Sequence, residues 1–507
     1  MGRVITSGMS LSFCREASLG VLPVQPQWFE LEPNSINSFG VTTSTTARTP
    51  IEKARARRKG VVTDLDSAVE FEADLTMTHI RLFAEDFLFA RSAGGDSYIA
   101  TAAVGGSGIN VAGNMSAAQA SRISWSAGGA KTLVYVHGFD NDANNGLKTV
   151  SAVSNPGGAA VFIAGVVDEV VPADTLAEVS IAGVRAAAGD LSIDAGGNIV
   201  SQALFFQNLG LVVGQAIHVG GVDALHQFSN PANTGFARVA KIEPKKLTLE
   251  KRDNPFVAEA GAGIAMDLLF GAFVRNVDVD HPDFLQPSTQ FELASPNLMP
   301  GGVTGAEYAV GNWADSLSMA IPLSGKATIT LGFVGQNTTK PSAARATNAT
   351  QAKGGGLTGA FGTASDIARL RVEDADEEGL STDFKSATFT LTNNVAGEKV
   401  LGHLGPKYLN AGNIECDVEN QMLFTNPDVI ERIRCNKTVG FDWVLRNGDG
   451  GFAVDLPTGT LSGGGREYPA NQSVLINTTF AAHQEDDGPG FTCGISFFPV
   501  LPAQPCA

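Results

Sequence analysis

One pattern of residues occurs twice in this chain, about ninety positions apart. The first copy spans residues 137–146 and the second spans residues 226–235, and both read His-x-Phe-x-Asn-x-Ala-Asn-x-Gly. A pattern that recurs at a fixed spacing indicates a repeated structural unit. We therefore expect two duplicated small β modules in the middle of the chain, over residues 122–203 and 204–275. Such modules favour a structural or binding role over a single catalytic pocket.

The composition predicts a mainly β protein. Charged residues make up only 17% of the chain, and its 58 glycines with frequent Thr, Asn and Val suit short strands joined by tight turns. At 507 residues the chain is long enough for about three domains.

The net charge is −17, from 35 Lys and Arg against 52 Asp and Glu. A surface of this sign repels phosphate, so we expect no tight binding of nucleic acid. No stretch is long and apolar enough to span a bilayer, and we expect no secretory signal at the N-terminus. We expect folding in a reducing cytoplasm and no membrane partner.

The five cysteines predict neither a disulfide framework nor a zinc site. Their number is odd, and no pair has the Cys-x-x-Cys spacing. Cys416 and Cys493 lie in strand-like runs, so we expect both to be small residues of the core. Cys506 lies in the tail.

Both ends of the chain contain a strand with alternating acidic residues, followed by a helix. Residues 69–74 and 414–419 alternate apolar and acidic side chains, which indicates strands with one wet face. The apolar spacing predicts a helix over 78–89. Asn426-Pro427-Asp428 predicts a second helix that ends at Arg434, with Asn426 as its cap and Pro427 at its first helical position.

The simplest architecture joins these ends in one β-sandwich or barrel with a flanking helix. Alternation over 317–333 around a central turn adds a hairpin to it. We expect this domain to comprise residues 1–121 and 276–507, interrupted by the two duplicated modules.

Two polar segments are predicted to be loops. Residues 34–60 end in the basic run Lys53-Ala-Arg55-Ala-Arg57-Arg58-Lys59, which favours a solvated loop or a contact with an acidic neighbour. Residues 337–356 are rich in Thr, Ala, Asn and Gly and are typical of a mobile loop.

No motif indicates an active site. The chain lacks the GxSxG, P-loop and HExxH patterns, so we expect no enzyme activity, no catalytic residue and no cofactor. The acidic runs at 373–378 and 485–487 are interpreted as solvated loops. Paired carboxylates can hydrolyse glycosides, but the few aromatic residues offer no clear sugar platform.

Some residues of the chain could in principle bind a metal ion. The oxygen ligands Asp140, Asp142 and Asn144 alternate as calcium ligands do, but the second copy has Ser229, Pro231 and Asn233 there, which favours a structural turn. The densest cluster is Asp278, Asp280, His281 and Asp283. Pro282 interrupts it, which favours an acidic loop. His137 and His226 recur at one position of the repeat, which indicates a shared packing or capping role. We expect no metal site.

The terminal segments resemble a known family. They comprise Leu11-Ser-Phe13, Glu16, Gly20, Pro23, Pro26 and Trp28, then Gly440-Phe-Asp-Trp443, Asp455-Leu-Pro457 and Gly490-Phe-Thr-Cys-Gly-Ile495-Ser-Phe-Phe-Pro499. Together with the strand and helix at 69–89, they resemble the major tail tube proteins of long-tailed, siphovirus-type bacteriophages. The repeated pattern resembles the Asn-Asn-Gly modules of the larger members. The resemblance covers most of the chain through diffuse motifs.

This resemblance implies a structural protein of the virion tail, assembled in the host bacterial cytoplasm. It implies stacked hexameric rings that form a conduit for genome DNA, with the tape measure, terminator and distal tail proteins as partners. Six copies at −17 each would give −102 formal charges per ring, and DNA would slide along an acidic lumen.

Two acidic strand faces are candidates for the lumen lining: Glu70, Glu72 and Asp74, and Glu415, Asp417 and Glu419. An ordinary solvated face is an equal interpretation of both. The alternative function is a surface adhesin or capsid decoration protein that binds glycans through the duplicated modules.

Overall fold

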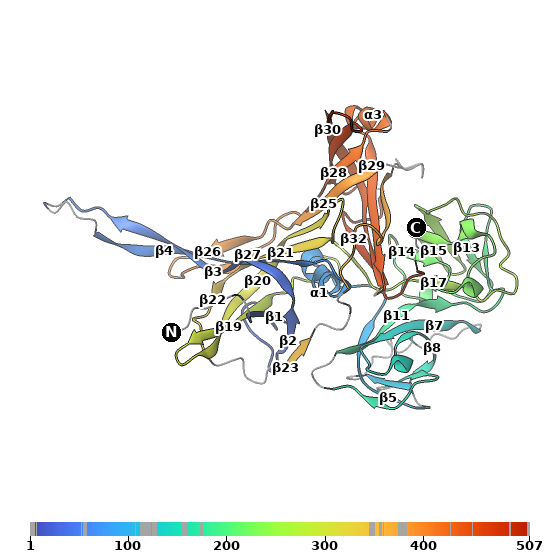
Figure 1. Cartoon of the computed structure of the whole chain (residues 1–507), viewed down its shortest axis with the longest axis horizontal. Coiled ribbons are helices and arrows are strands. Elements are labelled where there is room, and N and C mark those ends of the chain that lie inside the picture. Colours follow the sequence, from blue (N-terminus) through green and yellow to red (C-terminus); the bar gives the residue numbers. More distant parts are fainter. Residues whose placement is uncertain are drawn as a thin grey trace.

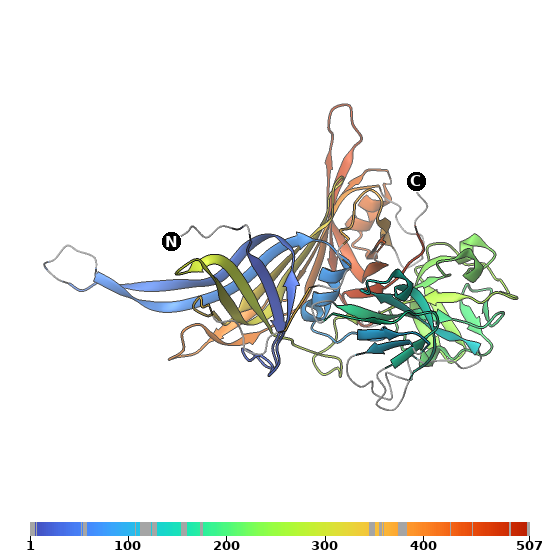
Figure 2. The same ribbon diagram turned by 60° about the horizontal axis from the view of Figure 1, so that its bottom comes forward.

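The protein is mainly β, as its composition predicts. The computed structural model describes residues 6–503 except 7, 52, 54–57, 107, 112–122, 124–128, 154–159, 173–175, 344–349, 354–356, 358, 374–382, 426, 449 and 486–487. This part holds two large sheets and the α-helices α1 (Met77–Leu88) and α3 (Asp428–Arg434). In Figures 1 and 2 the larger sheet forms the body and a long ribbon at one end, and the second sheet lies at the other end.

Strands from both ends of the chain build the larger sheet, as expected. Almost all of its pairs are antiparallel. Its strands are β1 (Ser10–Arg15), β2 (Gln27–Leu31), β3 (Pro33–Arg48), β4 (Arg58–Asp74), β18 (Phe273–Arg275), β19 (Thr289–Met299), β20 (Val303–Ile321), β21 (Thr328–Gly335), β22 (Asn337–Thr338), β23 (Thr350–Lys353), β24 (Ile367–Glu373), β25 (Phe384–Thr392), β28 (Glu415–Leu423), β29 (Thr438–Asn447), β30 (Gly450–Glu467), β31 (Leu475–Ala482) and β32 (Gly494–Phe498).

The centre of this sheet has one wet face and one buried face. Strands β4, β21, β20, β25 and β28 pair in that order. The expected hairpin is present, with Met319 opposite Ile329. Because successive side chains of a strand point to opposite faces, the polar residues lie on the solvated face and the apolar residues lie on the buried face.

Helix α1 covers the buried face. Thr76 caps its start by accepting a hydrogen bond from the His79 amide, as Thr at a helix N-cap does. Phe83 packs against Phe71 and Phe333, with ring centroids 6.2 and 5.7 Å away. Truncating a buried Phe of this kind costs about 3–5 kcal/mol, so α1 is an integral part of the core.

The second sheet lies between the two halves of the first in the sequence. Its strands are β5 (Ser97–Val104), β6 (Gly108–Val111), β7 (Lys131–His137), β8 (Gly146–Val153), β9 (Ala160–Ile163), β10 (Glu169–Val170), β11 (Ala177–Arg185), β12 (Leu191–Ile193), β13 (Ile199–Ser201), β14 (Ala216–Val219), β15 (Gly235–Glu243), β16 (Lys246–Glu250) and β17 (Asp267–Leu269). We call residues 97–269 the inserted region.

Pairing in the inserted region follows one order twice. In the first half, β5, β6, β9, β8, β7 and β11 pair in turn, and β11 pairs back with β5. In the second half, β12, β13, β16, β15, β14 and β17 pair in turn. Strands β11 and β17 join the halves, with Val184 opposite Leu268.

Two expectations about local structure need correction. Residues 34–60 are largely strand rather than loop, because β3 and β4 pair along most of their length, from Pro33 opposite Ala73 to Arg48 opposite Arg58. Helix α3 begins after Pro427, which occupies the N-cap rather than the first helical position.

Several expected features fall partly or wholly outside the described residues. These are the Asn426 cap, Cys506, most of the acidic run at 373–378, residues 486–487, and much of the basic run and of the loop at 337–356. Cys416 and Cys493 are buried, as expected. In the described part of the chain, no helix is both long and apolar enough to cross a membrane.

Candidate assembly surfaces

The wet face at the centre of the larger sheet is polar from edge to edge. We call it the polar face. Strand register places its outward residues in three rows: Glu70, Gly332, Ser316, Thr392 and Glu415; Glu72, Thr330, Ser318, Thr390 and Asp417; and Asp74, Thr328, Ala320, Thr388 and Glu419. Each row begins and ends with a carboxylate, and small neutral side chains lie between. The two acidic strand faces singled out in the sequence are therefore the two borders of one surface.

The carboxylates of the polar face influence one another. Partial burial, followed by repulsion from Glu415 and Glu419, raises the pKa of Asp417. On the opposite border, a hydrogen bond from Asn34 and an ion pair with Lys326 lower the pKa of Asp74, although burial opposes that shift. The rows themselves contain no Lys or Arg.

The far part of the β3–β4 ribbon projects from the body as an arm, which we define as residues 41–48 and 58–66. Strand β21 pairs with β4 only from Ser67 to Asp74, and towards its tip the ribbon extends alone (Figure 1). A two-stranded hairpin is marginally stable by itself. The arm is therefore suited to being covered by another molecule.

A small hairpin supports the base of the arm. It consists of β26 (Ala396–Lys399) and β27 (Pro406–Asn410). The Lys399 ammonium lies 2.7 Å from an Asp64 carboxylate oxygen and 2.6 Å from one of Asp66. Both aspartates belong to β4, so this lysine bridges the hairpin to the arm.

An ion-pair chain joins the inserted region to helix α1. The Arg81 guanidinium lies 3.3 Å from the Glu178 carboxylate on β11, and His137 Nε2 lies 3.2 Å from the same oxygen. Although burial opposes the shift, His137 and Arg81 lower the pKa of Glu178 to about 2. His137 therefore has a structural role at this junction.

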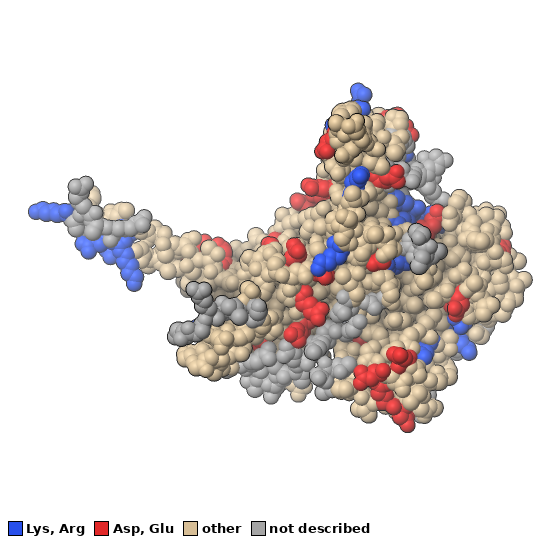
Figure 3. Space-filling model, viewed as in Figure 1, with Lys and Arg blue, Asp and Glu red and all other residues tan. Residues whose placement is uncertain are grey.

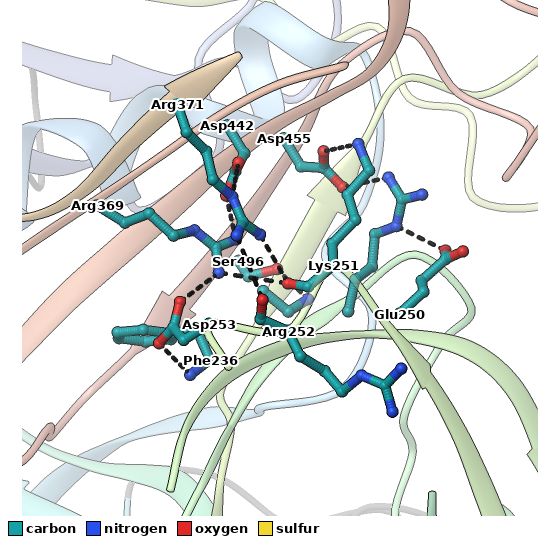
Figure 4. Close-up of polar contacts among 12 residues, drawn as sticks. Phe236, Glu250, Lys251, Arg252, Asp253, Arg369, Arg371, Asp442, Asp455 and Ser496 are labelled. Atoms are coloured by element: carbon teal, nitrogen blue, oxygen red, sulfur yellow. Dashed lines mark hydrogen bonds and ion pairs between the residues drawn. The ribbon is translucent and has the colours of Figure 1, made fainter. Parts of the chain in front are cut away.

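A second junction joins β15 and β16 to the larger sheet (Figure 4). Arg238 on β15 lies 2.8 Å from Glu250 and 2.8 Å from Asp455 on β30. Arg369 Nη1 lies 2.8 Å from Asp253.

Asp442 and the Lys251 carbonyl complete this second junction. Asp442 is buried between Arg369 and Arg371, which lower its pKa although burial opposes that shift. Arg371 also donates to the Lys251 carbonyl at 2.8 Å. Removing one partner of a buried ion pair costs about 3–5 kcal/mol, so these contacts hold the inserted region firmly.

The two copies of the repeated pattern form the same hydrogen-bonded loop. Asn144 donates to the Val167 carbonyl at 3.0 Å and to Glu169 at 2.8 Å, and its side-chain oxygen accepts from the Val167 amide at 2.7 Å. In the second copy, Asn233 makes the same three bonds with Val257 and Glu259 at 2.9, 2.7 and 2.7 Å.

Backbone donors complete the equivalence between the loops. The amides of Asp140 and Asn141 donate to Glu169, and those of Ser229 and Asn230 donate to Glu259. The expected structural turn is present in both copies. The partner glutamates were not predicted, although Val-x-Glu occurs at 167–169 and again at 257–259, 23 and 24 residues after Asn144 and Asn233, and would have revealed them.

Other residues considered as sites make local contacts of their own. His226 Nδ1 lies 2.7 Å from the Ala265 carbonyl, a contact unlike that of His137. The Asp283 amide donates to His281 at 3.1 Å, beside the exposed Asp278 and Asp280. Among the side chains that the structure describes, no group of three or more His, Cys, Asp and Glu is arranged to hold a metal ion.

Comparison with known proteins gives one clear result. A family model described as phage tail tube protein matches residues 6–482, which is nearly the whole chain. Comparison with curated proteins finds no match.

Proposed function

Because this chain belongs to the phage tail tube protein family, whose members are non-enzymatic structural components of the virion tail, we propose that its copies form hexameric rings. The rings stack into the hollow tube of a siphovirus-type tail, through which the genome DNA passes. Tail tube proteins assemble with themselves and with other tail proteins. The partners proposed for this chain are the tape measure, terminator and distal tail proteins.

This proposal rests on the polar face, which we assign as the lining of the tube lumen. Its three rows offer hydroxyl, glycine and alanine positions between carboxylates, with no cation in the rows to hold phosphate. Favourable phosphate contacts would have to be broken at every step of DNA passage, whereas repulsion keeps the DNA mobile. Small side chains also leave the channel wide.

The inserted region then lies outside the tube. Helix α1 packs against the face of the sheet opposite the polar face, and Arg81 of α1 holds Glu178 of the inserted region. The second junction adds Asp455 and Asp442 as anchors. If the polar face surrounds the DNA, this mounting displays the inserted region on the outer surface without obstructing the channel.

We propose that the inserted region consists of two duplicated modules, expected over 122–203 and 204–275. The shared loop around Asn144 and Asn233 supports the duplication. Strand pairing supports a division that begins earlier in the chain, since β5 pairs with β11 and β13 pairs with β16.

A neighbouring subunit covers the arm when rings stack. The exposed two-stranded ribbon supports this for the arm, since pairing with a neighbour would cover its backbone edges. Closed rings would use the same pairing between subunits.

Electron microscopy of the purified protein, and of virions, tests this function. We expect six-fold rings and tubes with a central channel, in which the polar face surrounds the channel. Monomers that never form rings or tubes under any condition would contradict the proposal, as would a tube with the inserted region inside its channel.

A further inference from the structure

The first repeat loop differs from the second in charge, although their hydrogen bonds are the same. Positions 140 and 142 contribute backbone to the loop, and their counterparts are Ser229 and Pro231. Asp140 and Asp142 are exposed, so the fold of this loop does not require carboxylates there. Asp168, also exposed, lies beside Glu169 in the same loop cluster. We call Asp140, Asp142 and Asp168 the acidic loop.

The far end of the arm has the opposite charge. Arg48 lies opposite Arg58 in the ribbon, and Lys59 follows at once. The side chains of Arg48 and Lys59 are exposed, so acidic groups of another molecule can approach this end of the arm. We call Arg48, Arg58 and Lys59 the basic end.

The two charged surfaces lie on opposite sides of the molecule. Figure 3 shows Lys and Arg at the tip of the arm, whereas Asp and Glu gather on the other side of the body, over the loops beside β5 and β8. A head-to-tail assembly brings two different surfaces of successive copies together. Complementary charges on such surfaces set the register and speed the encounter.

We propose that the basic end of the arm docks on the acidic loop of a second copy of this chain. This inference rests on the proposed tube assembly and identifies where the arm makes its contact. The inserted region then becomes a receptor for the neighbouring subunit as well as an outer decoration. Because both surfaces are exposed, the contact weakens as the ionic strength rises.

Charge exchange between the two surfaces tests the proposal. One variant combines Arg48→Glu with Lys59→Glu, a second combines Asp140→Lys with Asp142→Lys, and a third carries all four substitutions. The control combines Asp278→Lys with Asp280→Lys, since these exposed aspartates have the same spacing outside the acidic loop. The protein concentration needed for tube formation is measured by light scattering and electron microscopy at low salt, after circular dichroism has verified folding.

We expect each two-residue variant of the docking surfaces to need at least about tenfold more protein, which is about 1.4 kcal/mol per contact. The four-residue variant should regain tube formation, and the control should match the unmodified protein. Normal tube formation by the Asp140→Lys, Asp142→Lys variant overturns the docking proposal, and so does loss in both variants without recovery in the third. Failure of the unmodified protein to form tubes would instead contradict the proposed function.

Discussion

Asp86 on α1 shows how burial and a neighbouring cation compete at a single residue. Arg15 Nη2 lies 3.2 Å from its carboxylate, which is almost fully buried. Burial raises the pKa of Asp86 to about 7, although attraction to Arg15 opposes the shift. An unfolded aspartate titrates near pH 4. The ionised group therefore destabilises the fold, by a cost that is absent below about pH 4 and complete above about pH 7.

Replacing this carboxyl should stabilise the protein at high pH. Asp86→Asn keeps the shape and the acceptor for Arg15, and we expect it to raise the unfolding free energy by roughly 2 to 4 kcal/mol at pH 8. The gain should vanish near pH 4 in denaturant titrations. Glu85→Gln is the control: Ser92 and Arg15 lower the pKa of Glu85 although burial opposes them, so its loss should destabilise at pH 8. A stabilisation independent of pH would contradict the assignment.

Glu178 has the opposite pH dependence. Because its pKa is lowered to about 2, the ionised carboxylate stabilises the junction above the unfolded pKa near 4.3, and this contribution is lost as the pH falls from about 4 to about 2. We expect Glu178→Gln to speed hydrogen exchange in β11 at pH 7 and to change nothing near pH 2. Arg81→Met should reproduce the effect at pH 7. Equal hydrogen exchange rates in the unmodified protein and in both variants at pH 7 would show that this junction does not hold the inserted region on α1.

At the scale of elements, the repeated loops offer a matched pair of substitutions. Asn144→Ala and Asn233→Ala each remove three hydrogen bonds and leave the Val167 or Val257 backbone without its partner. A buried polar group left unpaired costs about 1–3 kcal/mol, so we expect similar destabilisation in both variants. Asp140→Ala should cost less than about 0.5 kcal/mol, since only its backbone supports the loop. If Asp140→Ala lost much stability in calcium-containing buffer and not in calcium-free buffer, that result would support the calcium interpretation instead.

The elements that the sequence predicted well are those with a local signal. Alternation at Val69, Phe71 and Ala73 depends on the pleat of one strand, and Thr76 caps the helix that follows it. The arm was mistaken for a loop because Val41, Thr42 and Thr43 are exposed on a ribbon stabilised by pairing. A polar sequence indicates solvent contact there, and it does not distinguish an exposed ribbon from a loop.

For the candidate surfaces too, the sequence revealed the local features and not the long-range contacts. Both borders of the polar face were visible as acidic strands, but only the register from Glu72 through Ser318 to Asp417 places them on one surface. Two ion pairs that cross the second junction, Arg238 with Asp455 and Arg369 with Asp253, join residues more than a hundred positions apart. No spacing in the sequence encodes such contacts.

At the scale of the whole molecule, the sign of the charge on the polar face decides whether a tube repels or retains DNA. Glu72→Lys with Asp417→Lys reverses the charge at both ends of the central row, and in a hexamer it would place a double ring of cations around the channel. Each cation that meets a phosphate releases a counterion, so binding strengthens steeply as salt falls. We expect assembled variant tubes to retain short duplex DNA in co-sedimentation at 50 mM salt and to release it above about 200 mM.

Unmodified tubes, and tubes of the Asp278→Lys, Asp280→Lys variant, should retain little DNA at either salt concentration. Phage built with the variant should eject DNA more slowly. Equal retention by variant and control tubes would mean that the polar face does not line the channel.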